Sequence, residues 1–161
     1  MRTKSIISIM FVAIICASCS SLKQVVGTTT NGITPTSPAY TSGAGFGTAL
    51  SNLYKSYKTA GNKVNLSDAN TWINVISLAT NASVIKGNMK DATFYKNFAA
   101  GSISGSSNLI TSSTVDKVIS SAIGLDLNTI LSAGKNASSL NSTSASSIAS
   151  GLATILGAMG K

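Results

Sequence analysis

Apolar residues recur at helical spacing through most of the chain from residue 43 onward. In the first such stretch Phe46, Leu50, Leu53 and Tyr57 follow one another at intervals of four, three and four residues. This spacing places their side chains on one face of a helix. The pair Gly61–Asn62 follows, and glycine or asparagine just past a periodic run is typical of a helix end. The pattern therefore predicts a first helix that ends close to residue 60.

The next stretch predicts a second helix between two polar boundaries. Ser67 or Asp68 is suited to cap its N-terminus, and Gly87 with Asn88 is suited to end it. The apolar residues that share one side of this helix are Trp72, Ile73, Ile76, Ala79 and Ala82. We expect that side to face the core.

Shorter helical patterns follow. Asp91 is placed to cap a short helix in which Phe94 and Phe98, four residues apart, share a face. Residues 101–112 are rich in serine and glycine and predict a loop, from which Leu109 and Ile110 insert into the core. Ser113 stands three residues ahead of Asp116, which resembles a capping box and predicts a helix over Val115, Val118, Ile119 and Ala122.

Two further helices are expected towards the C-terminus. Residues 126–133 carry Leu127, Ile130 and Leu131, and residues 145–158 carry apolar side chains at intervals of four, three and four (Ile148, Leu152, Ile155, Met159). The patterns add up to five or six short helices within residues 43–161, enough for one hydrophobic core. Alternating strand patterns are almost absent, so an all-α bundle is predicted.

The first 18 residues have the composition of a signal peptide. Arg2 and Lys4 precede an apolar run from Ile6 to Ala17, which is shorter than the roughly 20 residues that a membrane-spanning helix needs. A charged start, a short apolar run and then small residues form the pattern of a secretory signal. The alternative is a buried N-terminal helix of a cytosolic protein, which the polar stretch after Lys23 disfavours.

The end of this run, Cys16-Ala17-Ser18-Cys19, resembles the lipobox of bacterial lipoproteins, in which small residues precede a cysteine that is acylated and becomes the new N-terminus. Ala17 and Ser18 match the small positions, whereas Cys16 stands where the family usually has an aliphatic residue. The resemblance implies that lipid on Cys19, such as palmitate, holds the protein on a membrane. Ser20 and Ser21 imply the outer membrane facing the periplasm, with the cell surface as the alternative. A Cys16–Cys19 bridge in an uncleaved chain is the other use of these cysteines.

Residues 19–42 predict a disordered tether between the lipid and the helical domain. They hold both prolines of the chain, Pro35 and Pro38, among threonine, serine and glycine, without a sustained period. Fully extended, about twenty such residues reach roughly 60–70 Å.

Few catalytic chemistries are open to the chain beyond residue 18. It has no histidine, glutamate or arginine, and Cys19 is its one cysteine. This composition excludes Ser–His and Cys–His catalysis and the usual zinc sites. Three of its four aspartates stand where helices should begin, so capping explains them. Ser–Lys catalysis stays formally open, although no such pair has a distinctive setting. We expect a protein that is not an enzyme and binds neither a metal nor a cofactor.

The charge of this part of the chain, ten lysines against four aspartates, is positive. A positive balance can indicate nucleic acid or anionic lipid as a partner. The lysines are spread singly, and no arginine is present to make bidentate phosphate contacts. Nucleic acid is therefore not expected, and the lysines are interpreted as solubilising surface charge.

Two local features suggest binding sites, and each has a simpler explanation. The glycines of residues 43–47 resemble a phosphate-binding loop in composition but lack its spacing, so they are interpreted as a flexible lead-in to the first helix. The aromatic residues Trp72, Phe94, Tyr95 and Phe98 are candidates for a ligand groove, although aromatic residues at helical spacing usually belong to a core.

The segment from Ala145 to Lys161 is amphipathic and fits either a helix on a membrane surface or the last helix of the bundle, which its serine- and threonine-rich polar face favours. The sequence predicts a membrane-anchored envelope lipoprotein whose helical domain binds another envelope component, such as a protein, or has a structural role. The alternatives are a membrane-active protein that acts through its C-terminal helix, and a carrier of lipids or small molecules. The oligomeric state is left open.

Overall fold

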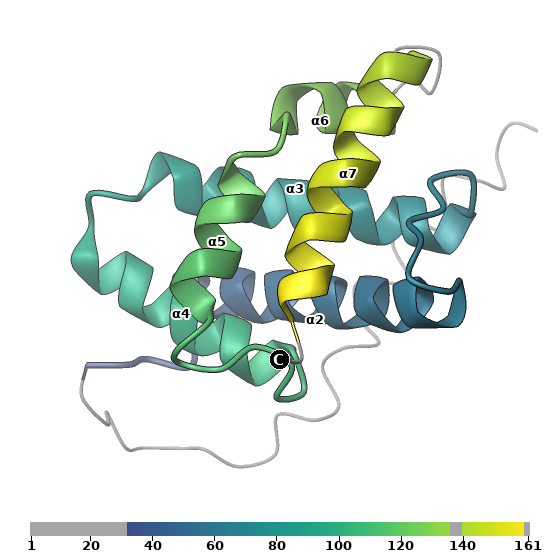
Figure 1. The fold of residues 1–161 in the computed structure, drawn as a ribbon. Coiled ribbons are helices and arrows are strands. Elements are labelled where there is room, and N and C mark those ends of the chain that lie inside the picture. Colours follow the sequence, from purple (N-terminus) through teal and green to yellow (C-terminus); the bar gives the residue numbers. More distant parts are fainter. Residues whose placement is uncertain (1–31, 136–139, 160–161) are drawn as a thin grey trace, which may run out of the picture. The chain divides into compact units, whose positions relative to one another are not determined.

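The computed structural model describes residues 32–135 and 140–159, and every regular element within these ranges is a helix. The signal peptide, Cys19 and residues 19–31 of the predicted tether lie outside the described residues. The described helices are α2 (Pro38–Thr59), α3 (Ala69–Gly87), α4 (Ala92–Gly105), α5 (Val115–Ile123), α6 (Leu127–Lys135) and α7 (Ser142–Ala158). The predicted all-α architecture is confirmed (Figure 1).

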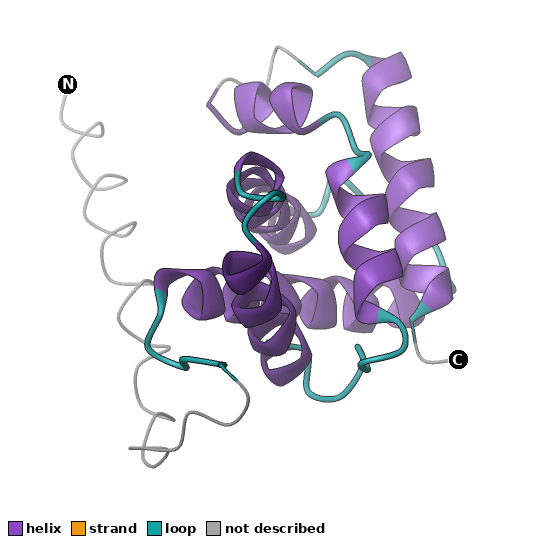
Figure 2. Cartoon of the chain, turned by 90° about the vertical axis from the view of Figure 1, so that its left-hand side faces the viewer, coloured by secondary structure: helices purple, strands orange, loops and turns teal. Residues whose placement is uncertain are grey.

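Helix α2 is the central element of the bundle. It packs against α3, α4 and α7, and its most extensive contact is with α4. Helices α5 and α7 lie side by side, and α6 packs against α3 (Figures 1 and 2). The core is formed by fully buried side chains from all six helices, among them Phe46, Leu78, Phe98, Ile119, Ile130 and Leu152. The rings of Phe46 and Phe98 meet within it, with their centroids 5.4 Å apart.

Helix α2 begins five residues earlier than predicted. Ser37 caps it by accepting a hydrogen bond from the backbone N–H of Tyr40 (3.1 Å), and Pro38 occupies the first turn. Proline is favoured there because a backbone N–H in the first turn has no acceptor within the helix, so its absence costs no hydrogen bond. Pro38, which suggested a linker in the sequence, is therefore part of a helix start.

Backbone contact joins α2 to α4. A side chain at Gly43 or Gly47 would collide with the backbone of α4, and one at Gly101 or Gly105 would collide with the backbone of α2. Each helix thus has two glycines four residues apart, on the side that faces the other helix. Two sequence predictions are corrected by this contact. Residues 43–47 are helix interior and not a flexible lead-in, and residues 101–105 continue α4 and are not a loop.

Both ends of the α2–α3 connection follow the sequence prediction. The backbone N–H of Asn62 donates to the carbonyl of Tyr57 (2.8 Å) and that of Gly61 donates to Lys58 (3.2 Å). This pattern, with φ of 68° at Gly61, is a Schellman cap. Asp68 then caps α3 by accepting from the N–H of Thr71 (2.6 Å).

The buried side of α3 is rotated from the predicted one. Ala79 and Ala82 are buried as expected, but Ile73 is 53% exposed, and Trp72 and Ile76 are only partly buried. The fully buried positions include Val75, Leu78 and Ile85. Because α3 contacts α2, α4, α5 and α6, its buried surface follows these neighbours and not the row of its largest side chains.

The segment between α4 and α5 agrees with the prediction in part. Ile110 is fully buried and Leu109 packs against the core, as expected. The capping box at Ser113 is wrong, since Thr114 is the residue before α5 and makes no side-chain cap. Its hydroxyl instead accepts from the N–H of Thr111 (3.0 Å).

Helix α7 is the last helix of the bundle. Asn141 caps it by accepting from the N–H of Ser144 (2.8 Å), so it begins three residues before the predicted start. Its predicted apolar positions Ile148, Leu152, Ile155 and Met159 are all buried. Bundle packing of this segment, one of its two interpretations, is confirmed.

The α2–α4 contact yields a stability test. We expect Gly47→Ala to lower the free energy of unfolding by about 2 kcal/mol. Inserting a methyl group against backbone that cannot rotate away costs roughly 3 kcal/mol, and the better helix propensity of alanine returns only about 1 kcal/mol. Urea denaturation followed by circular dichroism measures the difference.

Gly157→Ala in α7 is the matched control. A Cβ atom there would lie 3.9 Å from the Tyr57 hydroxyl, an ordinary contact. The same substitution should therefore raise the stability, by up to about 1 kcal/mol. Equal effects of the two substitutions would contradict a close backbone contact at Gly47.

Candidate functional site

The four aromatic residues singled out from the sequence do not line one groove. Phe98 is fully buried, whereas Trp72, Phe94 and Tyr95 are partly buried and pack against the core. Trp72 lies in the first turns of α3, about 22 Å along the helix from its last residue, Gly87. Phe94 and Tyr95 lie in the first turn of α4, which begins just beyond that far end. The structure places these residues in and around the core.

Tyr95 links two helix starts. Its hydroxyl donates to Asp116 Oδ1 (2.7 Å) in the first turn of α5. Partial burial of the phenol, together with the hydrogen bond to the Asp116 carboxylate, raises the pKa of Tyr95 to about 12. Both groups act in holding α4 to α5.

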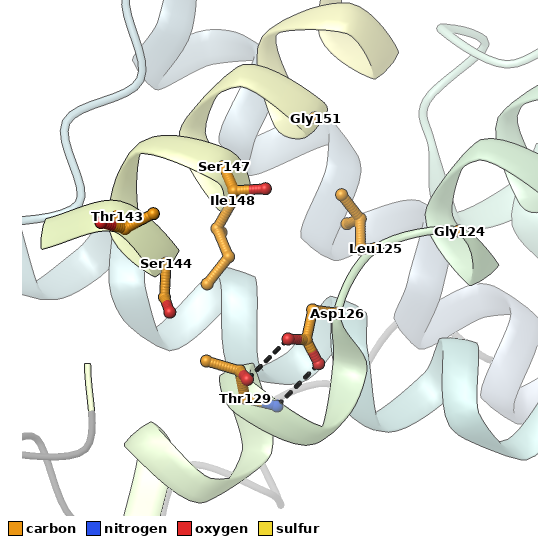
Figure 3. Close-up of a pocket in the computed structure, with 9 residues that line it drawn as sticks. All are labelled: Gly124, Leu125, Asp126, Thr129, Thr143, Ser144, Ser147, Ile148 and Gly151. Carbon is orange, nitrogen blue, oxygen red and sulfur yellow. Dashed lines mark hydrogen bonds between the residues drawn. The ribbon is translucent and has the colours of Figure 1, made fainter. Parts of the chain in front are cut away.

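A pocket of about 380 Å³ between the α5–α6 connection and α7 is the candidate site (Figure 3). Four hydroxyl side chains, one carboxylate and two aliphatic side chains line it, together with two glycines. They are Gly124, Leu125, Asp126, Thr129, Thr143, Ser144, Ser147, Ile148 and Gly151. The pocket is small and polar for a ligand site, and its hydroxyls can both donate and accept hydrogen bonds.

One wall is the start of α6. Asp126 precedes this helix and accepts two hydrogen bonds from Thr129, one from the backbone N–H to Oδ1 (3.1 Å) and one from the hydroxyl to Oδ2 (2.7 Å). The hydrogen bond from the Thr129 hydroxyl, and then that from its N–H, hold the pKa of Asp126 below its usual range. The pocket therefore contains a carboxylate that is ionised at neutral pH.

The opposite wall is α7. Thr143, Ser147 and Gly151 are spaced four residues apart and share one face of the helix. Gly151 shapes this wall, because a Cβ atom there would lie 2.5 Å from Leu125 Cδ2. The absence of a side chain at residue 151 lets Leu125 lie against the helix backbone.

A second hollow of about 330 Å³ lies beside the first. It shares Leu125 and Asp126 with it and is otherwise lined by Ser83, Lys86, Gly87, Leu127 and Asn128. The positive charge of Lys86 makes a further, smaller contribution to the lowered pKa of Asp126. Asp126 thus stands between two depressions in the surface.

The side chains of this pocket offer hydrogen bonding and apolar contact. The Asp126 carboxylate, which Thr129 holds, is the one acid or base among the residues that line the 380 Å³ pocket. Within residues 32–135 and 140–159, no three histidine, cysteine or acidic side chains come together as metal ligands. Hydroxyls from two helices, with Leu125 and Ile148 between them, can contact a ligand that has both hydroxyl groups and C–H surface.

Among these residues, the sequence indicated only Ile148, as an apolar position of the last helix, and residue 126, as the start of a helix. The pocket joins residues 124–129 to residues 143–151, and serine and threonine are too frequent in this chain to form a recognisable motif. The one available signal is the repeat of Thr143, Ser147 and Gly151 along the face of α7.

No known protein family, curated protein or solved structure matches this chain. Among the helices in the described ranges, none has the length and apolar content needed to cross a membrane.

The Tyr95–Asp116 pair predicts a pH effect. The folded pKa of about 12 exceeds the ordinary value of 10.0, so folding favours the neutral phenol. The resulting stabilisation is complete below pH 10 and disappears as the pH rises through 12. We expect phenolate absorbance from Tyr95 to develop near pH 12. The difference between titrations of the wild type and of Tyr95→Phe isolates it, and a Tyr95 midpoint near pH 10 would contradict the pairing with Asp116.

Proposed function

We propose that this protein is an envelope lipoprotein, held on a membrane by lipid on Cys19, whose helical domain binds a small ligand without catalysis. The lipid is inferred from the lipobox-like residues 16–19. The proposed location of the protein is the outer membrane, facing the periplasm. The hydroxyl-lined pocket between α6 and α7 carries the binding function.

The ligand that fits this pocket best is a saccharide of one or two units. Sugars combine hydroxyl groups with apolar C–H faces, and the pocket offers Thr129, Ser144 and Ser147 beside Leu125. Its volume of about 380 Å³ is at the small end of ligand sites. The ionised Asp126 favours neutral or amine-bearing sugars and disfavours acidic ones.

The packing of α7 favours this function over a membrane-active one. The apolar residues that would enter a bilayer, among them Ile148, Leu152 and Ile155, are buried in the core. Exposing them would require α7 to leave the bundle, at a cost of several kilocalories per mole in lost apolar burial.

Intact mass of the protein purified from membranes tests the anchor. We expect a chain that begins at residue 19 and carries acyl chains. In Cys19→Ala the acyl mass should be absent, because the sulfur that accepts the lipid is gone. An unmodified wild-type chain that begins at Met1 would contradict the lipoprotein proposal.

Nuclear magnetic resonance titration of the full chain with glucosamine and with glucuronic acid tests the pocket. Glucosamine should shift the amide signals of Thr129, Ser144 and Ser147, and glucuronic acid should not, because Asp126 repels its carboxylate. Ser147→Leu should weaken glucosamine binding about tenfold or more, since losing the hydrogen bond to the sugar and filling the pocket costs at least about 1.4 kcal/mol.

Ser146→Leu is the matched control. Ser146 is exposed on the same turn of α7 but does not line the pocket, so the dissociation constant should change by less than about twofold. The absence of any shift with glucosamine, or equal losses in the two variants, would refute saccharide binding at this pocket.

A further inference from the structure

Basic residues are distributed unevenly along this chain. Asp68 is the first acidic residue, and four lysines lie between Cys19 and Asp68. From Asp68 to the C-terminus, six lysines are accompanied by four aspartates. Most of the excess positive charge from residue 19 onward therefore belongs to the part of the chain that contains Cys19 and α2.

Three of these lysines lie in or just after the last turns of α2. Lys55 and Lys58 lie in the last two turns of α2, three residues apart and therefore on neighbouring positions of one side. Lys63 follows the Schellman cap, where the hydrogen bond from Asn62 to Tyr57 turns the chain back against the helix end. All three side chains are exposed. We call this surface the basic end.

Tyrosine side chains accompany the lysines. The Lys58 Nζ atom lies 5.4 Å from the centroid of the Tyr54 ring, and both Tyr54 and Tyr57 are partly buried beside the core. Tyrosine combines an apolar ring with a polar hydroxyl, which suits the boundary between lipid headgroups and water.

The nearby carboxylate does not neutralise the basic end. The hydroxyls of Ser56 and Thr71 are 3.1 Å apart, so the start of α3, with Asp68, lies next to the last turns of α2. The Asp68 carboxylate accepts the N–H of Thr71 at the start of α3. Three lysines and this one aspartate leave the basic end with a net positive charge.

We propose that the basic end docks on a membrane surface that displays anionic phosphate headgroups. Each lysine near such a surface increases the docked population about fivefold, so three lysines contribute roughly a hundredfold. This attraction is weak for a free protein, but a lipid anchor raises the local concentration of membrane around the domain. The strength of docking in the cell therefore depends on the proposed lipid on Cys19. The attraction between the lysines and anionic headgroups does not depend on that lipid.

Helix-end electrostatics explain only part of this charge. A lysine in the last turn of a helix interacts favourably with the helix dipole, which accounts for Lys58. Lys63 lies beyond the helix, and Lys55 lies before its last turn. A purely structural role would change the thermal midpoint of the domain and leave its response to lipid composition unaltered.

The chain has a natural probe for the test, because Trp72 is its one tryptophan and lies next to Thr71 near the basic end. The full chain is mixed with vesicles of phosphatidylcholine, alone or with phosphatidylglycerol, that carry a headgroup-attached fluorescence quencher. We expect stronger quenching of Trp72 on the anionic vesicles. The difference between the two compositions should disappear between about 0.05 and 0.5 M salt, since salt screens exposed charges.

The decisive variant replaces Lys55, Lys58 and Lys63 by glutamine, and the matched control replaces Lys90, Lys117 and Lys135. All six side chains are exposed and each triple variant loses the same charge. The first variant should lose roughly a hundredfold in docked population on anionic vesicles, and the control should retain most of it.

Equal losses in both variants would show a dependence on net charge alone, and that result would overturn docking through the basic end. Equal quenching on neutral and anionic vesicles would overturn it as well. A missing lipid on Cys19 would give a different result. The intact mass would lack the acyl chains, but the quenching of Trp72 would still be stronger on anionic vesicles. Circular dichroism of both variants verifies that the helices are intact.

Discussion

The sides of α2 and α4 that face each other consist of backbone at successive turns, because Gly43, Gly47, Gly101 and Gly105 leave no side chains between them. Van der Waals contact over this area is available only while the two helices remain this close, since dispersion attraction falls off within fractions of an ångström. The rings of Phe46 and Phe98, one on each helix, then meet beside the contact. The position of α4 on α2 is thereby fixed.

Other contacts of the domain depend on this pair. With α4 on one side, α2 has its remaining faces available for α3 and α7. The start of the described chain is held by α4 as well, because the buried Asn97 side chain accepts from the N–H of Thr34 and donates to the carbonyl of Gly32. Tyr95 connects α4 to α5 through Asp116. A shift of α4 would therefore disturb the position at which the chain enters the domain and that of α5 beside α7.

The two proposed binding surfaces differ in chemistry and in position. The pocket lies between α6 and α7 and offers hydroxyls with one carboxylate, whereas the basic end lies at the last turns of α2 and offers lysines with tyrosines. The two proposals are compatible, because docking of the basic end on a membrane would leave the pocket, formed by other helices, available to a separate ligand.

Local signals in the sequence determined the helices and most of their ends. Asp68, Asp91 and Asn88 act at helix ends as their residue types suggest, and the periodic residues of α7 are buried. These features depend on hydrogen bonds and side-chain spacing within a few residues, so one segment contains all the information. The sequence also determined which catalytic groups are available, because the chain contains no histidine and no glutamate.

Tertiary contacts decided the rest. Glycines at 43, 47, 101 and 105 are poor helix formers alone, and only the approach of a second backbone gives them a stabilising role inside helices. Which side of α3 is buried depended on four neighbouring helices, and the pocket exists only where residues 124–129 meet α7. The sequence of one segment cannot specify such features, because their energy comes from residues distant in the chain.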